Sequence, residues 1–168
     1  MQTINKTMVM VFFCLLVLNS FSEADLIDST CKKTSFPNLC LTTLRSSGVS
    51  VKASVNELVI NILKASLSYA SDSSNQINDL LKKATGGFQK QCLKICAKNY
   101  DVAISGIREA IQEIGRNEIS MAQSPINSID VEARNCDSAC KLRISIPFSV
   151  RNTMLSHFAT IMLEILKG

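Results

Sequence analysis

The 168-residue chain has few of the side chains that catalytic sites need. It contains a single histidine, His157, and a lone histidine in a helical segment is more often a packed structural residue than a base, because a catalytic base must itself be oriented by another group. No glycine-rich phosphate loop follows a strand pattern. The carboxylates are dispersed among basic residues, as expected of a solvated surface: Asp101, Glu109, Glu113, Asp130, Glu132 and Glu164. We therefore expect a protein that is not an enzyme and has no catalytic residues, no metal and no cofactor.

Charge of one sign is also scarce. The formal net charge is +4, and no run of basic residues with interleaved aromatic residues occurs, which argues against nucleic acid as a partner. No segment of any length alternates apolar and polar residues as a half-buried strand would. The sequence therefore predicts an all-α protein.

The N-terminal segment has the pattern of a secretory signal peptide. Lys6 precedes an apolar run from Met8 to Leu18, and Ser22 and Ala24 occupy the positions that a signal peptidase reads. A membrane anchor would need about 20 apolar residues, and this run is too short. We expect residues 1–24 to be removed and Asp25 to become the N-terminus of a secreted protein with no membrane association.

The cysteines favour disulfides. The chain has seven cysteines and Cys14 lies in the expected signal peptide, so six remain, an even number in an oxidising compartment. Cys92 with Cys96 and Cys136 with Cys140 have a spacing that places two sulfurs on one face of a helix. In an antiparallel helix pair, two nested cross-links become feasible, because the residue numbers of Cys96 and Cys136 have the same sum as those of Cys92 and Cys140. Zinc is the alternative ligand for such thiols, and the secretory compartment argues against it.

The remaining chain divides into a short N-terminal segment and a longer helical part. In residues 25–47, Cys31 and Cys40 flank the turn formers Pro37 and Asn38, which predicts two very short helices that a disulfide would hold together. In residues 48–168, apolar residues recur every three or four positions along four segments. The predicted fold is an up-and-down four-helix bundle preceded by a short disulfide-stapled helical hairpin.

The apolar stripes set the expected helices. The first starts at Val51 and ends before Gly86, and the polar residues 71–75 leave open whether it is continuous or broken. The second spans residues 88–114, and the third begins near residue 119, although Ser124 and Pro125 favour a start or a kink there. The last follows Pro147, with this stripe: Val150, Met154, Phe158, Ile161 and Ile165.

The antiparallel register can be extended from the cysteines to other positions of the second and third helices. It pairs Ala103 with Ile129 and Phe88 with Ile144, which are apolar pairs. It also pairs Tyr100 with Glu132, which we expect to form a hydrogen bond near the rim of the bundle.

These features resemble one known family, the plant invertase and pectin methylesterase inhibitors. The resemblance covers the whole chain after the signal peptide and rests on these motifs: Leu26-Ile27-Asp28-Ser29-Thr30-Cys31-Lys32-Lys33-Thr34, Phe36-Pro37-Asn38-Leu39-Cys40, Cys96-x3-Tyr100-x2-Ala103 with Ile107, Cys136-Asp137, and Asn152. It implies a single inhibitor domain, residues 25–168, with disulfides Cys31–Cys40 and Cys96–Cys136. Cys92 and Cys140 are extra to the family's four cysteines, and we interpret them as a third disulfide.

The resemblance also implies a function. It predicts a secreted inhibitor that docks reversibly, one to one, over the substrate cleft of a pectin methylesterase in the plant cell wall or apoplast, and so modulates pectin de-esterification. The alternative target is an acid invertase of the cell wall or vacuole. Some invertase inhibitors carry a Pro-Lys-Phe motif between the second and third bundle helices, and its absence from residues 115–118 favours pectin methylesterase. The candidate contact residues point outward from those helices: Lys98, Asp101, Arg108, Asn127 and Asp130.

A helical, disulfide-rich defence protein is the second alternative. Paired Cys-x3-Cys motifs also occur in small plant helical hairpins with antimicrobial activity. The segment between the two pairs is too long here, and burial of the apolar stripes would leave no strongly cationic amphipathic face for a membrane.

Overall fold

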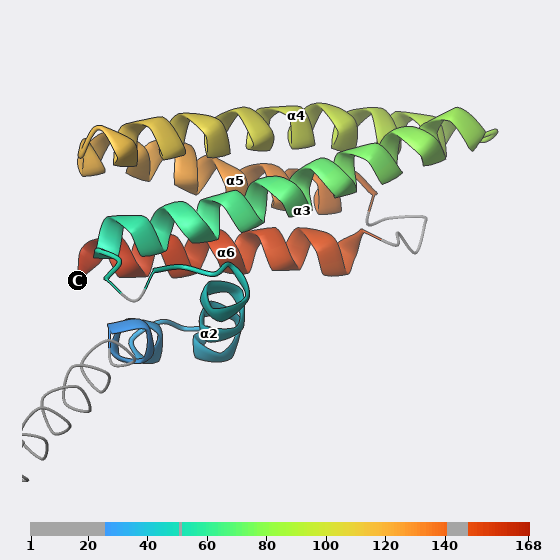
Figure 1. Cartoon of the computed structure of the whole chain (residues 1–168). Coiled ribbons are helices and arrows are strands. Elements are labelled where there is room, and N and C mark those ends of the chain that lie inside the picture. The colour runs from blue at the N-terminus through green and yellow to red at the C-terminus, as the bar shows by residue number, and fades with distance from the viewer. Residues whose placement is uncertain (1–25, 51, 141–147) are drawn as a thin grey trace, which may run out of the picture.

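A computed structural model of the chain describes residues 26–50, 52–140 and 148–168. These residues form helices and no strand. Four long helices make an up-and-down bundle: α3 (Val55–Lys83), α4 (Gly87–Gly115), α5 (Ile119–Cys140) and α6 (Ser149–Lys167). Residues 26–32 and α2 (Pro37–Ser46) form a helical hairpin beside α6, on the side away from α4 (Figure 1). The predicted fold class is therefore confirmed, whereas the expected signal peptide lies outside the described residues.

Helix α3 begins at a capping box. The Ser54 hydroxyl accepts the Glu57 N–H at 3.3 Å, and the Glu57 carboxylate accepts the Ser54 N–H at 2.6 Å. These two bonds satisfy N–H groups that a helix start otherwise leaves unpaired. The predicted start at Val51 is therefore too early, and Val51 itself lies outside the described residues.

The polar residues 71–75 do not interrupt α3. Ser73 is fully buried and its hydroxyl donates to the Tyr69 carbonyl oxygen at 2.8 Å, one turn earlier. A serine in a helix interior can be buried at low cost when its hydroxyl finds such a partner. Of the two alternatives left open by the sequence, the continuous helix is the one observed.

The four predicted stripes supply most of the core. On α4 and α5 they are buried almost throughout, from Cys92 to Ile114 and from Ala122 to Cys140. Val150 is the clear exception, because it is 74% exposed: in the same turn of α6 it is Arg151 and Asn152 that contact the other helices, and Val150 lies on the outer side. Ala103 and Ile129 are both buried, and Ile144 lies outside the described residues.

Helix α5 runs through Pro125 instead of starting there. Proline has no N–H, so the carbonyl of Met121 loses its usual helical partner at this position inside the helix. Pro125 is buried against Gly106 of α4: a Cβ atom at Gly106 would lie 3.0 Å from the Pro125 carbonyl oxygen. The missing side chain at Gly106 therefore permits a close approach of the two helices.

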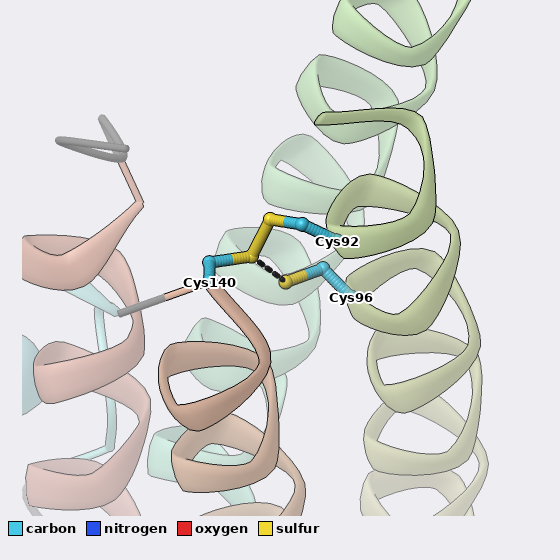
Figure 2. Close-up of side chains that lie close together, drawn as sticks. All are labelled: Cys92, Cys96 and Cys140. Atoms are coloured by element: carbon cyan, nitrogen blue, oxygen red, sulfur yellow. Dashed lines mark hydrogen bonds between the residues drawn. A yellow bond between two sulfur atoms is a disulfide. The ribbon is translucent and has the colours of Figure 1, made fainter. Parts of the chain in front are cut away.

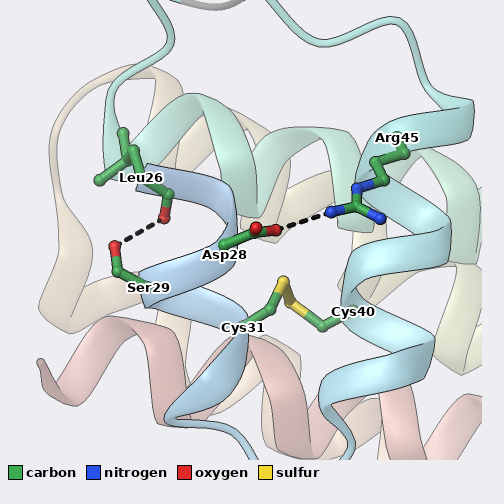
Figure 3. A network of polar contacts seen from close by, with 6 residues as sticks. All are labelled: Leu26, Asp28, Ser29, Cys31, Cys40 and Arg45. Carbon is green, nitrogen blue, oxygen red and sulfur yellow. Dashed lines mark hydrogen bonds and ion pairs between the residues drawn. A yellow bond between two sulfur atoms is a disulfide. The ribbon is translucent and has the colours of Figure 1, made fainter. Parts of the chain in front are cut away.

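The N-terminal hairpin is held together by one disulfide and one ion pair (Figure 3). Cys31 and Cys40 are bonded and fully buried. Asp28 and Arg45, on the two sides of the hairpin, form an ion pair at 2.8 Å. Because such short helices are unstable alone, these cross-links explain how the segment keeps its shape.

The hairpin docks on α6 through its turn. The Glu164 carboxylate accepts hydrogen bonds from the Ser35 N–H, at 2.7 Å, and from the Ser35 hydroxyl. The Phe36 ring stacks on the His157 ring with centroids 3.7 Å apart. His157 is thus a packing residue, as predicted, whereas Glu164 is an anchor for the hairpin and not merely part of a solvated face. Within the described ranges, no helix is long and apolar enough to cross a membrane.

Candidate functional site

Two disulfides fasten α4 to α5 at one end of the bundle. Cys92 pairs with Cys140 and Cys96 with Cys136, with Cα atoms 5.2 and 4.5 Å apart. The four side chains are at most 2% exposed. The nested pairing matches the antiparallel register, and it includes the third disulfide that the family resemblance alone does not supply.

The same cluster is where a metal site would have been expected. The sulfurs of Cys92, Cys96 and Cys140 all lie within 4.8 Å of one another (Figure 2). Each of these sulfurs is bonded to another sulfur, however, and zinc binds thiolates, not disulfides. In the oxidised protein the cluster is a pair of cross-links.

A chain of hydrogen bonds, buried at Tyr100 and Asn152 and partly buried at Asp137, joins α4, α5 and α6 near the disulfides. The Tyr100 hydroxyl, on α4, donates to the Asn152 side-chain oxygen on α6 at 2.7 Å. The Asn152 amide nitrogen donates to the Asp137 carboxylate on α5, also at 2.7 Å. The predicted Tyr100–Glu132 bond is wrong: Tyr100 is 1% exposed and points to α6, which a register between α4 and α5 could not reveal.

A fourth helix joins this network through Arg151. Its guanidinium donates to the Ser73 hydroxyl on α3 at 2.8 Å and lies over the Tyr69 ring, 5.1 Å from the centroid. Burial raises the pKa of Tyr100 to about 12, although a hydrogen bond with Ser73 opposes the shift. Tyr100, Asp137 and Asn152, which carry the family resemblance, are thus contacts that fix the helices relative to one another.

The turn between α4 and α5 is tied to the bundle by its own side chains. Arg116 pairs with Glu113 at 2.5 Å and with Glu118 at 3.5 Å. Hydrogen bonding to Arg116 lowers the pKa of Glu113, which is buried and so is not the solvated carboxylate that we predicted. Asn117 adopts a left-handed conformation, φ 62°, and its side-chain oxygen accepts from Asn56 of α3 at 2.9 Å.

The predicted contact residues lie along the outer faces of α4 and α5. On α4, Lys98, Asp101 and Arg108 are exposed and spaced so that they share one face. On α5, Asn127 is exposed, while Asp130 is half-buried and paired with Arg134.

A hollow of about 560 Å³ lies beside these residues, between α4 and α5, and sequence reasoning missed it. Gly106 and Pro125 are among its lining residues, and two apolar side chains of the lining are exposed: Val102 by 41% and Met121 by 61%. The remaining lining is mostly hydroxyls, from Ser105, Ser120, Ser124 and Ser128, together with Glu109. The available signals in the sequence were Gly106, which has no side chain, and Pro125 inside a helical pattern, because both residues are compatible with unusual packing between two helices.

Comparisons with known proteins agree with this architecture. A crystal structure of a mutant form of a pectin methylesterase inhibitor from Arabidopsis superposes with a TM-score of 0.71 at 19% identity, covering 82% of this chain and 92% of that one. A second structure of a pectin methylesterase inhibitor, from Arabidopsis thaliana, gives a TM-score of 0.65 at 19% identity, covering 85% and 95%. At such identities these likenesses establish the fold.

The sequence itself matches a curated relative and a family model. The relative is the Arabidopsis thaliana protein named "Cell wall / vacuolar inhibitor of fructosidase 1", 28% identical over 116 residues. The match covers 68% of this chain and 56% of that protein, so the chain spans only about half of its relative's length. The family model "Plant invertase/pectin methylesterase inhibitor" matches residues 25–165, and the chain therefore belongs to this family of enzyme inhibitors.

Proposed function

We propose that this member of the family inhibits a pectin methylesterase, docking one to one over the substrate cleft and so limiting pectin de-esterification in the plant cell wall. The protein would act without catalytic residues, metal or cofactor, by presenting a rigid helical surface. Secretion to the apoplast, directed by residues 1–24, is part of this proposal. Two disulfides and the Tyr100 network fix the helices before binding. This supports a mechanism in which the inhibitor loses little conformational entropy on docking.

The choice of target rests on the turn between α4 and α5. Some invertase inhibitors carry Pro-Lys-Phe there, a segment that offers an aromatic and a cationic side chain to a partner. In this chain Arg116 and Asn117 are engaged with Glu113, Glu118 and Asn56 of the same bundle. A turn whose side chains are used internally supports a target that does not need this contact.

The outer face of α4 and α5 is the docking surface that we propose. Exposed apolar residues surrounded by polar ones are typical of interfaces, and Val102 and Met121 are so placed at the hollow. Lys98, Asp101, Arg108, Asn127 and Asp130 would form the polar rim, contributing more to specificity and association rate than to affinity.

An acid invertase of the cell wall or vacuole is the second candidate target. The observation that favours it is the curated relative, whose name describes an inhibitor of a fructosidase. In that case the protein would act in the apoplast or the vacuole.

The test is a titration of the purified, oxidised protein into a pectin methylesterase assay and an acid invertase assay at mildly acidic pH. We expect stoichiometric loss of pectin methylesterase activity only. Invertase inhibition alone would select the second target, and inhibition of neither enzyme by folded protein would contradict both.

Variants test the docking surface separately. Val102→Asp and Met121→Asp should weaken inhibition at least tenfold without changing the circular dichroism spectrum. Val150→Asp is the matched control, because Val150 is also an exposed apolar residue but lies on α6. Equal inhibition by all three variants would rule out this face.

A further inference from the structure

The two disulfides between α4 and α5 lie close enough for a thiolate from one, once it is reduced, to reach a sulfur of the other. The Sγ atoms of Cys96 and Cys140 belong to different disulfides and yet lie 3.5 Å apart (Figure 2). The bonded partner of Cys96 is Cys136, one turn before Cys140 on α5. A sulfur of α4 thus has two sulfurs of α5 within reach.

Thiol–disulfide exchange requires a thiolate next to a disulfide sulfur. When the Cys92–Cys140 bond is open, the Cys140 sulfur lies beside the Cys96–Cys136 bond, and its thiolate is the attacking form. Its attack on Cys96 forms a Cys96–Cys140 bond, breaks the Cys96–Cys136 bond and leaves the electron pair on Cys136, which takes up a proton. One bond forms and one breaks, so the step needs no oxidant or reductant, and Cys136 can reverse it.

We propose that Cys96, Cys136 and Cys140 form a thiol–disulfide exchange site inside the folded bundle, and that closure of the Cys92–Cys140 bond ends the exchange. Before closure, the cross-link to Cys96 passes between Cys136 and Cys140, so a bond formed first at either position is converted to the final pairing. The oxidation that closes the second bond removes two electrons and two protons, which a disulfide oxidant of the secretory compartment accepts.

Cys92 cannot replace Cys140 as the attacking group. Cys92 and Cys96 are four residues apart on the same helix, where Cβ atoms are about 5–6 Å apart. A disulfide needs Cβ atoms about 3.5–4.5 Å apart, so a Cys92–Cys96 bond would distort α4. At Cys96, the exchange is therefore confined to the two cysteines of α5.

This difference provides a matched pair of variants. Cys92→Ser leaves Cys140 without its partner, and Cys140→Ser leaves Cys92 without its partner, while both keep the other bundle disulfide. Each oxidised protein would be quenched with acid, denatured and labelled with N-ethylmaleimide, and then digested at Lys94 and Asp137 so that each cysteine falls in its own peptide. Circular dichroism would confirm that both variants are helical.

In Cys92→Ser we expect the label on both Cys136 and Cys140. The amounts should lie within about tenfold of each other if the two pairings differ in free energy by no more than about 1.4 kcal/mol. In Cys140→Ser we expect the label on Cys92 alone. Label confined to Cys140 in the first variant, or label on Cys96 or Cys136 in addition to Cys92 in the second, would overturn the proposal.

The unmodified protein gives a second measurement that does not depend on how the variants fold. Brief treatment with a phosphine reductant, which is oxidised as it reduces a disulfide to two thiols, should produce molecules that have lost one bundle disulfide. Among these we expect a Cys96–Cys140 peptide with label on Cys92 and Cys136. If every such molecule keeps only native pairs, no exchange occurs and the proposal is wrong.

Discussion

Tyr100 of α4 donates its hydroxyl hydrogen to the side-chain oxygen of Asn152 on α6 over 2.7 Å, inside the core. Asn152 in turn donates to Asp137 of α5. Three residues from three helices therefore form one polar chain among apolar neighbours, and each loses its partner if the bundle changes register. Such a chain specifies one arrangement of helices, which non-directional apolar contacts do less well.

We predict that Tyr100→Phe destabilises the protein by about 1–3 kcal/mol, because it leaves the buried Asn152 oxygen without a donor. The measurement is urea unfolding followed by circular dichroism. Tyr69→Phe, which retains the ring beneath Arg151, is the control and should cost less. Equal unfolding midpoints for Tyr100→Phe and the unmodified protein would contradict the role of this bond.

The raised pKa of Tyr100 predicts a loss of stability in alkali. The pKa is about 12 in the folded protein against a usual value of 10.0, since burial disfavours the phenolate. The folded state therefore holds the proton more tightly, and its stability is unaffected below pH 10 and falls as the pH rises from 10 towards 12.

A titration of phenolate absorbance checks this directly. The chain has two tyrosines, so Tyr69→Phe leaves Tyr100 as the only one, and we expect its ionisation near pH 12 or together with unfolding. A midpoint near 10.0 in a protein that remains helical would show that Tyr100 is not buried as described.

The helices and disulfides were predictable from local patterns. Apolar spacing identified the α4 and α5 stripes, and the two Cys-x3-Cys motifs then fixed which residues face each other across them. Periodicity reports which side of a helix is apolar, and an antiparallel pair has only one register that joins both cysteine pairs. These features depend on at most two helices at a time.

Features that depend on a third helix were missed. Tyr100 was assigned to Glu132 because its true partner, Asn152, comes from α6. No pair of residues in the sequence marks the register of α6 relative to α4. Val150 was placed in the core because α6 has apolar residues on more than one side, and the buried side there includes the polar residue Asn152, which an apolar pattern does not mark. The helix through Pro125 depends on the space left by Gly106, a tertiary effect that overrides the usual role of proline as a helix start.

The nested disulfides should not contribute independently. In the loop-entropy model a lone cross-link closing either loop contributes about 4 kcal/mol, but once one is closed the second restricts only short segments. We expect Cys92→Ala with Cys140→Ala, or Cys96→Ala with Cys136→Ala, to cost about 2–3 kcal/mol each by this model. Replacing all four should cost more than the sum of the two, as measured by urea unfolding. Strictly additive costs would mean that the two disulfides restrict the unfolded chain independently of each other.

Glu164 is expected to control the docking of the N-terminal hairpin. Glu164→Ala removes the acceptor of both Ser35 hydrogen bonds and should speed amide hydrogen exchange in residues 26–46 while leaving α4 and α5 unchanged. Glu109→Ala, on the outer face of α4, is the control. Unchanged exchange in the hairpin would show that the Phe36–His157 stack and the apolar contacts hold it without Glu164.

Gly106→Ala separates helix propensity from helix packing. Alanine favours a helix over glycine by about 0.5–1 kcal/mol, so a change without tertiary consequences would stabilise α4. The added Cβ would lie 3.0 Å from the Pro125 carbonyl oxygen, a backbone atom that moves only if α5 moves. Overpacking of this kind costs about 1–3 kcal/mol, so we expect net destabilisation.

Gly87→Ala is the control for this change, since a Cβ there has nothing within 4 Å and the substitution should be neutral or stabilising. Because Gly106 and Pro125 also line the hollow between α4 and α5, Gly106→Ala should weaken enzyme inhibition as well as stability. Thermal unfolding and the inhibition titration measure the two effects. A stabilised Gly106→Ala protein with full inhibition would show that the close approach of α4 and α5 matters neither for the fold nor for docking.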